Sequence, residues 1–478
     1  MVSFNLVKIA ALLCTGSVVA GDDLAALAKK IRINKKKLKN NVRTIALMNE
    51  HMSNMTTAMD EMVASYDERI SSLSSLLGYT ASSCCASSVP SSIPSFLPSA
   101  SPTKTLSYVP TAAPSKSSQP TTTCAATDIG AISGVSTKIL TVAIHGNYMI
   151  VANPNSDEVE LFMRQDESSS WSTVKTYTPS IDLNYSSKFG DATALDDQHI
   201  VITSLGYYSS DTGRLFIYDR ATDAETIFEN PGPSLGSDLF GCSVALFGNI
   251  IVVGAQYDDT SDTNSGIVYI YEKNSGVWEY VQAITAPDGG YNDYFGGSVA
   301  TDGDLIVVGA TGAGTGGAVY LYGYGTDEFY SLRKIEPDEI ESSDSFGRSV
   351  ATSGGIITIG APYFDKGLSY QAGAVFFYSY DSNQNSVTLL EQKNGSGSST
   401  RLGYTVAMEG NRIAVSSYDN HIDLYMISTT KTLTLLGTMT SSAVYFGSII
   451  AFSKNSVLSV GGYSYSTQTL YQQIICGM

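Results

Sequence analysis

Histidine, tryptophan and cysteine are scarce in this chain, whose 478 residues include only four, two and six of them. The sequence has no HExxH, GxSxG or P-loop pattern, so it lacks the local signatures of zinc peptidases, α/β-hydrolases and P-loop nucleotidases. No cysteine lies in a CxxC pair or at a Cys/His spacing typical of a zinc site. We therefore expect a protein that is not an enzyme and that requires no cofactor.

Basic residues are also few. The chain has 28 Lys and Arg against 45 Asp and Glu, and the resulting net charge of -17 argues against a general nucleic-acid binder. The imbalance lies in one part of the chain, because 16 basic and 38 acidic residues occur from Cys124 onward, whereas the first 123 residues contain 12 and 7. Two physically different regions are therefore joined.

No stretch of the chain is apolar over the length of a membrane-spanning helix. The apolar run Ile9–Ala20 follows Lys8 and ends in small residues before Gly21, which predicts a secretory signal peptide at residues 1–20. The run is too short to cross about 30 Å of hydrocarbon, although an uncleaved anchor is the alternative. We expect no transmembrane segment and a location outside the cell or at the cell surface, where disulfides are the default for cysteines.

Residues 21–78 contain a heptad repeat of apolar residues, and no proline or glycine interrupts Asp22–Leu77. This pattern is typical of a coiled coil, so we expect a homo-oligomer formed through residues 22–77. Asn34 and Asn41 fall in the second apolar row, where polar residues can fix register and strand number. The alternative is one amphipathic helix packed on the rest of the chain. The first apolar row contains Leu24, Ile31, Leu38, Ile45, Met52, Met59, Tyr66 and Leu73.

Residues 79–123 are predicted to be a disordered linker. Between Thr80 and Thr123, 27 of 44 residues are Ser, Thr or Pro, which is too little apolar surface for a packed core. Cys84 and Cys85 follow the predicted helix directly, where the strands of a parallel oligomer lie close together. We expect interchain disulfides there, with an intrachain or free pair as the alternative.

From Cys124 onward the chain is repetitive. The clearest copies are FGCSVALFGNIIVVGA at 240–255, FGGSVATDGDLIVVGA at 295–310 and FGRSVATSGGIITIGA at 346–361. Weaker copies begin at Phe189, Leu402 and Phe446, and a seventh begins near Lys138. Repeats of this length are typical of solenoids and propellers.

Each repeat contains four runs of strand character, which in the fourth repeat are 297–301, 305–309, 318–322 and 329–335. One such sheet cannot bury both faces, whereas radial stacking can, so residues 124–478 are predicted to be an all-β, seven-bladed β-propeller. The last repeat has only three such runs, ending at 470–475, and an unassigned run follows Cys124. Pairing the two would close the ring and bring Cys124 beside Cys476 in an intrachain disulfide.

The FG and GA units resemble FG-GAP repeats, which are known from integrin α subunits and many secreted proteins. The resemblance implies a seven-bladed propeller that acts as an extracellular adhesion or ligand-binding head. Calcium-binding members carry a DxDxDG-type loop between the first two strands, and this chain has a tight turn there in every repeat. The usual calcium sites of the family are therefore not carried over, although other oxygen-rich loops leave calcium binding possible in principle.

The loops from second to third strands, and from one repeat to the next, are expected to share one rim of the propeller. They are rich in acids and tyrosines, which suit calcium or contacts with proteins and sugars; ordinary solvated loops are the alternative. The candidate ligand-binding residues are Asp258, Asp259, Asp262, Tyr291, Asp293, Tyr294, Tyr363 and Asp365.

Asn54, Asn184 and Asn394 each begin an N-x-S/T sequon, which predicts a glycoprotein, although Ser and Thr are common enough for coincidence. The features together predict an oligomeric adhesion or ligand-binding protein whose propeller head binds a protein or glycan. A carbohydrate-active propeller enzyme and a structural coat or fibre subunit are the alternatives.

Overall fold

The computed structural model of this protein describes residues 141–474 with short gaps. The gaps are 154–155, 167–168, 184–187, 206–211, 233–236, 326–327, 366, 368, 441–446, 448, 453–456 and 463–468. The predicted signal peptide, coiled coil and linker lie outside the described residues, as do Cys84, Cys85, Cys124, Cys476, Asn54 and Asn184. Within the described part, no helix has the length and hydropathy needed to span a bilayer.

The strands form seven antiparallel sheets, and each sheet is built from strands consecutive in sequence. The first sheet contains β1 (Thr141–His145), β2 (Tyr148–Asn153), β3 (Glu158–Met163) and β4 (Ser172–Tyr177). The second contains β5 (Lys188–Leu195), β6 (His199–Leu205), β7 (Arg214–Asp219) and β8 (Glu225–Glu229). The third contains β9 (Phe240–Phe247), β10 (Ile250–Ala255), β11 (Ile267–Asn274) and β12 (Val277–Ile284).

The remaining sheets follow the same order. The fourth contains β13 (Phe295–Thr301), β14 (Leu305–Ala310), β15 (Ala318–Tyr324) and β16 (Phe329–Ile335). The fifth contains β17 (Ser349–Ser353), β18 (Ile356–Ala361), β19 (Ala374–Asp381) and β20 (Ser386–Asn394). The sixth contains β21 (Val406–Glu409), β22 (Arg412–Ser416), β23 (His421–Ile427) and β24 (Leu433–Thr440), and the seventh contains β25 (Ile449–Phe452), β26 (Val457–Gly462) and β27 (Thr469–Ile474).

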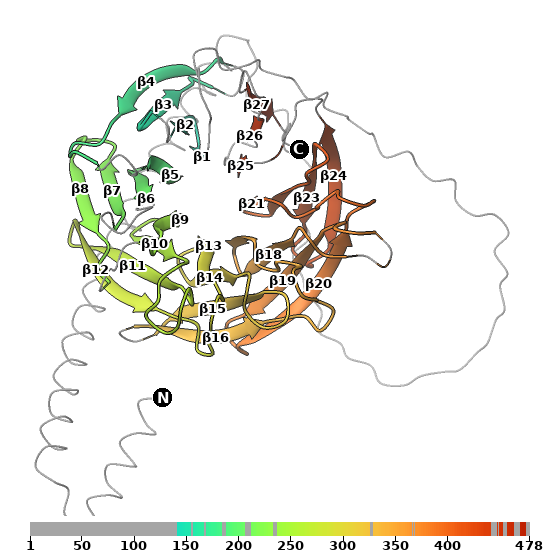
Figure 1. The fold of residues 1–478 in the computed structure, drawn as a ribbon. Coiled ribbons are helices and arrows are strands. Elements are labelled where there is room, and N and C mark those ends of the chain that lie inside the picture. The colour runs from blue at the N-terminus through green and yellow to red at the C-terminus, as the bar shows by residue number, and fades with distance from the viewer. Residues whose placement is uncertain are drawn as a thin grey trace, which may run out of the picture. The chain divides into compact units, whose positions relative to one another are not determined.

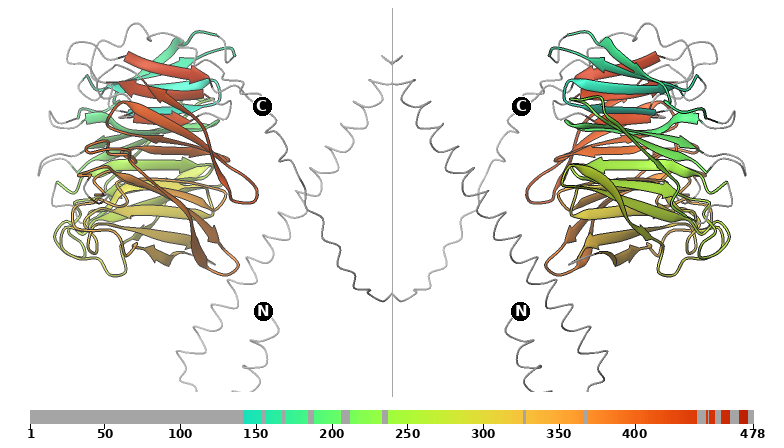
Figure 2. Two further views of the ribbon diagram at one scale, coloured as in Figure 1. Left: turned by 90° about the vertical axis from the view of Figure 1, so that its right-hand side faces the viewer. Right: turned by 90° about the vertical axis from the view of Figure 1, so that its left-hand side faces the viewer.

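The sheets are arranged radially around an axis, with the first strand of each innermost and the fourth outermost (Figure 1). The inner strands β1, β5, β9, β13, β17 and β21 each contact the next, and β25 lies against both β21 and β1. Figure 2 shows the ring edge-on, with loops extending beyond the strands on both faces. The described residues therefore form a β-propeller, as the repeats predict.

The number of complete blades differs from the prediction. The prediction of seven blades is wrong for the described residues, which form six four-stranded blades and one three-stranded sheet. The segment expected to supply a fourth strand to the last sheet follows Cys124 and lies outside the described residues. Within the described residues, the sheet β25–β27 therefore lacks its predicted outer strand.

Hydrophobic cores lie between neighbouring sheets. Second and third strands such as β10, β14 and β15 are buried over most of their length, because a sheet packs on each of their faces. One core joins Val252 and Ile270 of the third blade to Val308 and Tyr320 of the fourth. The three-stranded sheet takes part in two such cores, through Ala451 on the first-blade side and through β25 residues packed on the sixth blade.

The FG and GA glycines explain why the repeat has its sequence. Gly296 has φ +87°, a left-handed conformation that glycine adopts without strain, and the β13–β14 register shifts beside it. The GA glycine of each strong repeat faces the FG glycine of the next blade, so that an ideal Cβ on Gly309 would lie 2.1 Å from the carbonyl oxygen of Gly347. Backbones of adjacent blades can therefore approach only where both positions are glycine or a very small residue.

Hydrogen bonds from hydroxyl groups also join neighbouring blades at these glycines. Ser298 Oγ donates a hydrogen bond to the Gly347 carbonyl at 2.7 Å. Equivalent bonds join Thr141 to Gly190, Ser243 to Gly296 and Ser349 to Gly403 at 2.9, 2.7 and 3.0 Å. In the second blade Ala192 takes the place of the serine, and Thr203 of β6 donates to Gly241 instead, at 2.8 Å. The fourth residue of the FG motif is thus a blade-to-blade contact.

The outer strands carry β-bulges. In five of the six four-stranded sheets, the register between the third and fourth strands shifts by one residue. In the fourth blade the shift lies between Leu321 and Tyr322 and leaves Leu332 outside the pairing. A bulge twists the exposed strand and makes it a poor template for another strand.

Candidate functional site

The loops between second and third strands and between successive blades lie on one face of the propeller, which we call the loop face. Asn264 of the β10–β11 loop donates a hydrogen bond from Nδ2 to Asn292 Oδ1 of the β12–β13 loop at 2.7 Å. The backbone N–H of Tyr294 also donates to the Asn264 carbonyl at 3.0 Å. Loops of neighbouring blades therefore support one another.

The predicted acids of the loop face mostly accept hydrogen bonds from nearby backbone N–H groups. Asp258 is buried and accepts from Thr260 at 2.8 Å. Four more aspartates accept a backbone N–H in the same way, at 2.6–2.7 Å: Asp259 from Asn264, Asp262 from Thr263, Asp293 from Gly290 and Asp365 from Gln371. These carboxylates fix the conformation of the loops, because each satisfies a donor that the turn leaves unpaired.

Asp238, Asp293 and Asp344 occupy the same position, two residues before the FG phenylalanine, and all three are buried. Burial raises the pKa of each, and for Asp238 it does so to about 6, with a further rise from the nearby charges of Asp258 and Asp259. A carboxyl with a raised pKa in the folded state favours folding at low pH, and this contribution is lost as the pH rises through that pKa.

Replacing Asp238 by asparagine is therefore expected to stabilise the protein at neutral pH. The gain in unfolding free energy should be about 1 kcal/mol near pH 7.5 and should vanish below about pH 3, where the wild-type carboxyl is protonated in both states. Urea denaturation at several pH values measures it. Asp304→Asn, at an exposed position, is the control, and a loss of stability at neutral pH would show that the charged Asp238 is favourably paired.

Tyrosines provide most of the exposed apolar surface on the loop face. Tyr291 and Tyr370 have 68% and 62% of their surface exposed, and Tyr257 is also exposed. The rings of Tyr257 and Tyr294 lie 5.5 Å apart in a tilted arrangement, so the third and fourth blades share an aromatic pair. Tyrosine suits recognition, because it offers a large rigid ring together with a hydroxyl.

Arg401 organises a second part of the loop face. Its guanidinium lies 5.1 Å from the ring centre of Tyr363 and 4.8 Å from that of Tyr418. It also donates two hydrogen bonds to Gln371 Oε1, at 2.8 and 3.1 Å. We define Tyr257, Tyr291, Tyr294, Tyr363, Tyr370, Tyr418 and Arg401 as the tyrosine surface.

The structure thus places all the sequence-predicted site residues in loops of the loop face, in two groups. Asp258, Asp259, Asp262, Tyr291, Asp293 and Tyr294 lie in the loops of the third and fourth blades. Tyr363 and Asp365 lie in the β18–β19 loop of the fifth blade, where Tyr363 contacts Arg401. Arg401, Tyr257, Tyr370 and Tyr418 were missed by the sequence analysis. Arg401 immediately precedes the leucine of the weak repeat LGYTVA, and this alignment with the loops before the other FG motifs was the available signal.

No group of three or more His, Cys, Asp or Glu side chains converges on a metal position within the described residues. Calcium binding therefore has no assigned ligand set in this part of the chain. Asn394, the only described sequon residue, lies half-buried at the end of β20, and its Oδ1 accepts a hydrogen bond from Gln392 at 2.9 Å.

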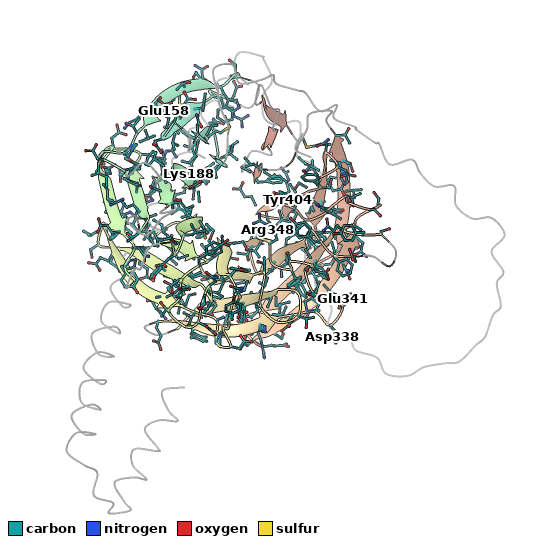
Figure 3. All side chains as sticks on the ribbon, viewed as in Figure 1. Glu158, Lys188, Asp338, Glu341, Arg348 and Tyr404 are labelled. Carbon is teal, nitrogen blue, oxygen red and sulfur yellow. The ribbon has the colours of Figure 1, made fainter. Side chains whose placement is uncertain are left out.

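Side chains of the inner strands line the axis. Figure 3 shows Lys188, Arg348 and Tyr404 directed toward it, whereas Asp338 and Glu341 lie at the periphery. Cys242 occupies the same motif position as Arg348, and burial raises the pKa of its thiol to about 11. It is the only cysteine among the described residues, and its thiol donates a hydrogen bond to the Gly296 carbonyl at 3.5 Å.

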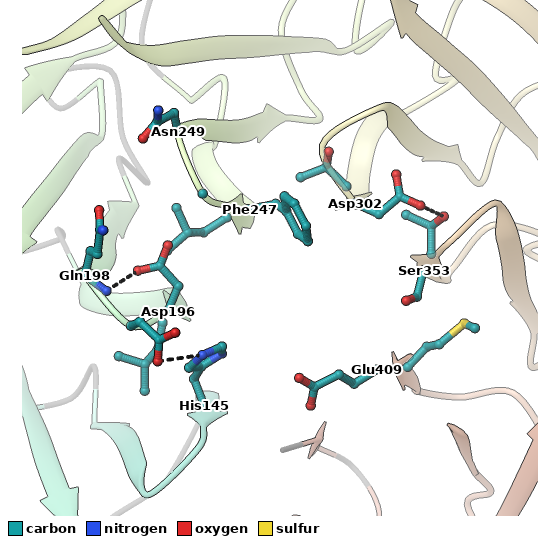
Figure 4. A pocket seen from close by; sticks show the side chains of 15 residues that line it. His145, Asp196, Gln198, Phe247, Asn249, Asp302, Ser353 and Glu409 are labelled. Carbon is teal, nitrogen blue, oxygen red and sulfur yellow. Dashed lines mark hydrogen bonds and ion pairs between the residues drawn. The ribbon is translucent and has the colours of Figure 1, made fainter. Parts of the chain in front are cut away.

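A cavity of about 540 Å³ opens on the other face of the propeller, which we call the hairpin face. All six four-stranded blades contribute to it through the turn between their first and second strands (Figure 4). Its lining residues are His145, Leu195, Asp196, Asp197, Gln198, Leu246, Phe247, Gly248, Asn249, Thr301, Asp302, Thr352, Ser353, Met408 and Glu409. We call this the axial cavity.

Two histidine–aspartate contacts lie on the acidic side of the axial cavity. His145 Nε2 lies 3.0 Å from Asp197 Oδ1, and the buried His199 ring places Nδ1 3.4 Å from Asp196 Oδ1. Lys273 Nζ lies 2.7 Å from His199 Nε2; because the ammonium can only donate, that nitrogen accepts and the ring proton is on Nδ1, facing Asp196. Burial acts to raise the pKa of Asp196, but hydrogen bonds from the His199 ring and from two backbone N–H groups outweigh it and lower the pKa.

Three segments of the chain, residues 234–271, 278–322 and 331–378, match the FG-GAP repeat family. FG-GAP repeats are typical of extracellular proteins, and such propellers generally have ligand-binding or adhesion roles. No curated protein matches the sequence.

Among solved structures, the WD40 repeats of RRP9 cover 72% of this chain and 97% of their own at 11% identity, with a TM-score of 0.50. The C-terminal WD40 domain of Sif2 covers 74% and 99% at 14% identity, with a TM-score of 0.47. The likeness to RRP9 shows the propeller fold alone.

Proposed function

We propose that this protein is a secreted or cell-surface adhesion protein that binds an extracellular protein or glycan through the tyrosine surface. The observation that carries this function is the gathering of exposed tyrosines and Arg401 on one face, over loops that hydrogen bonds hold in place. Aromatic rings and arginine are the residues that contribute most to binding at protein interfaces. Preformed loops also reduce the entropy lost on binding.

The predicted coiled coil at residues 22–77 would give the protein several heads. Each head then binds weakly, and the oligomer binds a surface tightly, because the second contact occurs at a high effective concentration. The Ser/Thr/Pro-rich linker would hold the heads apart and let them reach separate targets. A binding role also agrees with the lack of catalytic sequence signatures, and it requires neither an enzyme activity nor a cofactor.

Closure of the ring is part of this proposal. The sheet β25–β27 already lies between the first and sixth blades, and a strand from the segment after Cys124 would pair with its outer edge. Such pairing would bring Cys124 and Cys476 together in an intrachain disulfide that resists opening of the propeller. Cys84 and Cys85 would link the chains of the oligomer.

Removing two exposed tyrosines tests the binding face. The double variant Tyr291→Ser, Tyr370→Ser is expected to bind its target about tenfold more weakly, because exposed aromatic anchors are lost without cost to the core. Binding of full-length protein is measured on a glycan array and on immobilised matrix proteins. The matched control is Tyr330→Ser, which changes a 49% exposed tyrosine on the outer strand β16. Unchanged binding by the folded double variant would exclude the tyrosine surface.

A further inference from the structure

The axial cavity lies on the hairpin face, away from the tyrosine surface, and the proposed adhesion role makes no use of it. Its volume of about 540 Å³ is in the range of small-ligand sites, roughly 300–1,000 Å³. Because six blades each supply one turn to its wall, it exists only in the assembled propeller. No single loop forms this cavity; it depends on the folded ring as a whole.

Acidic side chains predominate in the lining of the axial cavity. Asp196, Asp197, Asp302 and Glu409 line it, together with His145, and none of the residues that line it is lysine or arginine. Two cations lie next to the turn of the second blade: Lys273 contacts His199, and Arg220 donates to the backbone carbonyl of Asp196 at 2.5 Å. Carboxylates gathered in a concave site produce a negative potential, which attracts cations and repels phosphates and carboxylates.

The carboxylates are held in position by their own turns. Asp196 accepts hydrogen bonds from the N–H groups of Gln198 and His199 at 2.8 and 2.6 Å. Asp302 accepts from the N–H of Leu305 at 3.1 Å with one oxygen and from the N–H of Gly355, in the next blade, at 3.3 Å with the other. These bonds orient the carboxylates before any ligand arrives.

One wall of the axial cavity is apolar. Phe247 is 53% exposed, and Figure 4 shows its ring directed into the cavity beside Asp302. An ideal Cβ on Gly303 would lie 2.9 Å from the ring, so the ring rests on the Asp302–Gly303 turn, where a side chain would displace it. Leu195 and Met408 add apolar surface. An aromatic face next to carboxylates is the arrangement that recognises organic ammonium and guanidinium groups.

We propose that the axial cavity binds an organic cation, an ammonium or guanidinium group on a short apolar arm. The carboxylates would receive the charged group, and Phe247 would cover the arm. The arm distinguishes this ligand from a bare metal ion, for which no group of three or more side-chain ligands converges within the described residues. The cation belongs either to a free amine or to a lysine or arginine side chain of a protein.

Benzylamine is a suitable probe, because it joins an ammonium group to an aromatic ring, and benzyl alcohol is its neutral counterpart. Ligand-observed NMR titration of the full-length protein is expected to show saturable binding of benzylamine that weakens with added salt, and at least about tenfold weaker binding of benzyl alcohol. A peptide with one internal lysine tests the second source: its binding points to a protein side chain, and binding of benzylamine alone points to a free amine. Both results support the proposal.

The double variant Asp197→Asn, Glu409→Gln removes two charges while keeping the shape of the axial cavity. It is expected to bind benzylamine about tenfold more weakly, and Phe247→Ala should weaken both benzylamine and benzyl alcohol. The matched control is Asp304→Asn, which removes one charge from the same hairpin face outside the cavity lining and should change binding less than about twofold. Equal binding of the two probes, no binding of either, or equal loss in the Asp304 variant would overturn the proposal.

Discussion

Replacing Gly309 by alanine is expected to lower the free energy of unfolding of the propeller by about 3 kcal/mol, at the upper end of overpacking effects. The new methyl group would lie 2.1 Å from the Gly347 carbonyl oxygen and 2.3 Å from Ser298 Oγ. The Ser298–Gly347 hydrogen bond holds both atoms in place, so the steric clash can be relieved only if the fourth and fifth blades move apart. Urea denaturation followed by tryptophan fluorescence or circular dichroism measures the change.

The control for Gly309 is Gly437→Ala in β24, where no atom lies within 4 Å of an ideal Cβ. That substitution should leave stability unchanged or slightly improve it, since alanine loses less backbone entropy than glycine on folding. If the two alanine variants unfold alike, the close approach of backbones between blades does not limit stability. Stability would then reside in the side-chain cores alone.

Deleting residues 21–123 is expected to weaken binding to a target-coated surface by about 100-fold, with little change in the affinity of one head. The deletion removes the predicted coiled coil and linker, so a head that leaves the surface no longer has a tethered neighbour to hold it there. Surface plasmon resonance at high and low target density measures both quantities. The loss should appear at high density, where several heads bind at once.

Fusing the deleted protein to an unrelated trimeric coiled coil separates avidity from other roles of the deleted segment. Restored surface binding would show that the segment acts by bringing heads together. Thermal unfolding of the deleted protein must first show that the head is still folded. Full surface binding by a folded, monomeric head would contradict the proposed multivalent function.

The fold was predictable because its glycines are visible in the sequence. In the fourth blade the expected strands 305–309 and 329–335 agree closely with β14 and β16. β13 begins two residues earlier than expected, at Phe295, because the bulge at Gly296 lets Phe295 pair with Ala310. Three strands of the last sheet are described, in agreement with the three strand-like runs after Phe446, and the fourth strand expected from the segment after Cys124 lies outside the described residues.

The site was less predictable. Acids and tyrosines of the loop face were found from composition, but the acceptor roles of Asp259 and Asp365 depend on backbone N–H groups that no pattern shows. The axial cavity was missed, because its walls come from six turns between His145 and Glu409 that approach only when the ring closes. Aligning those turns by repeat would have placed Asp196, Asp302 and Glu409 together.

The bulges of the outer strands have a consequence for an oligomer. In the proposed oligomer, heads joined by the predicted coiled coil would meet at a local concentration far above that of the free protein. Their outer strands would then be the parts most able to pair with one another. The residues that the bulges leave unpaired, such as Leu332, interrupt the regular row of backbone N–H and C=O groups that pairing between two edge strands requires. Heads held close together by the coiled coil should therefore remain separate, each with its loop face and hairpin face accessible to a target.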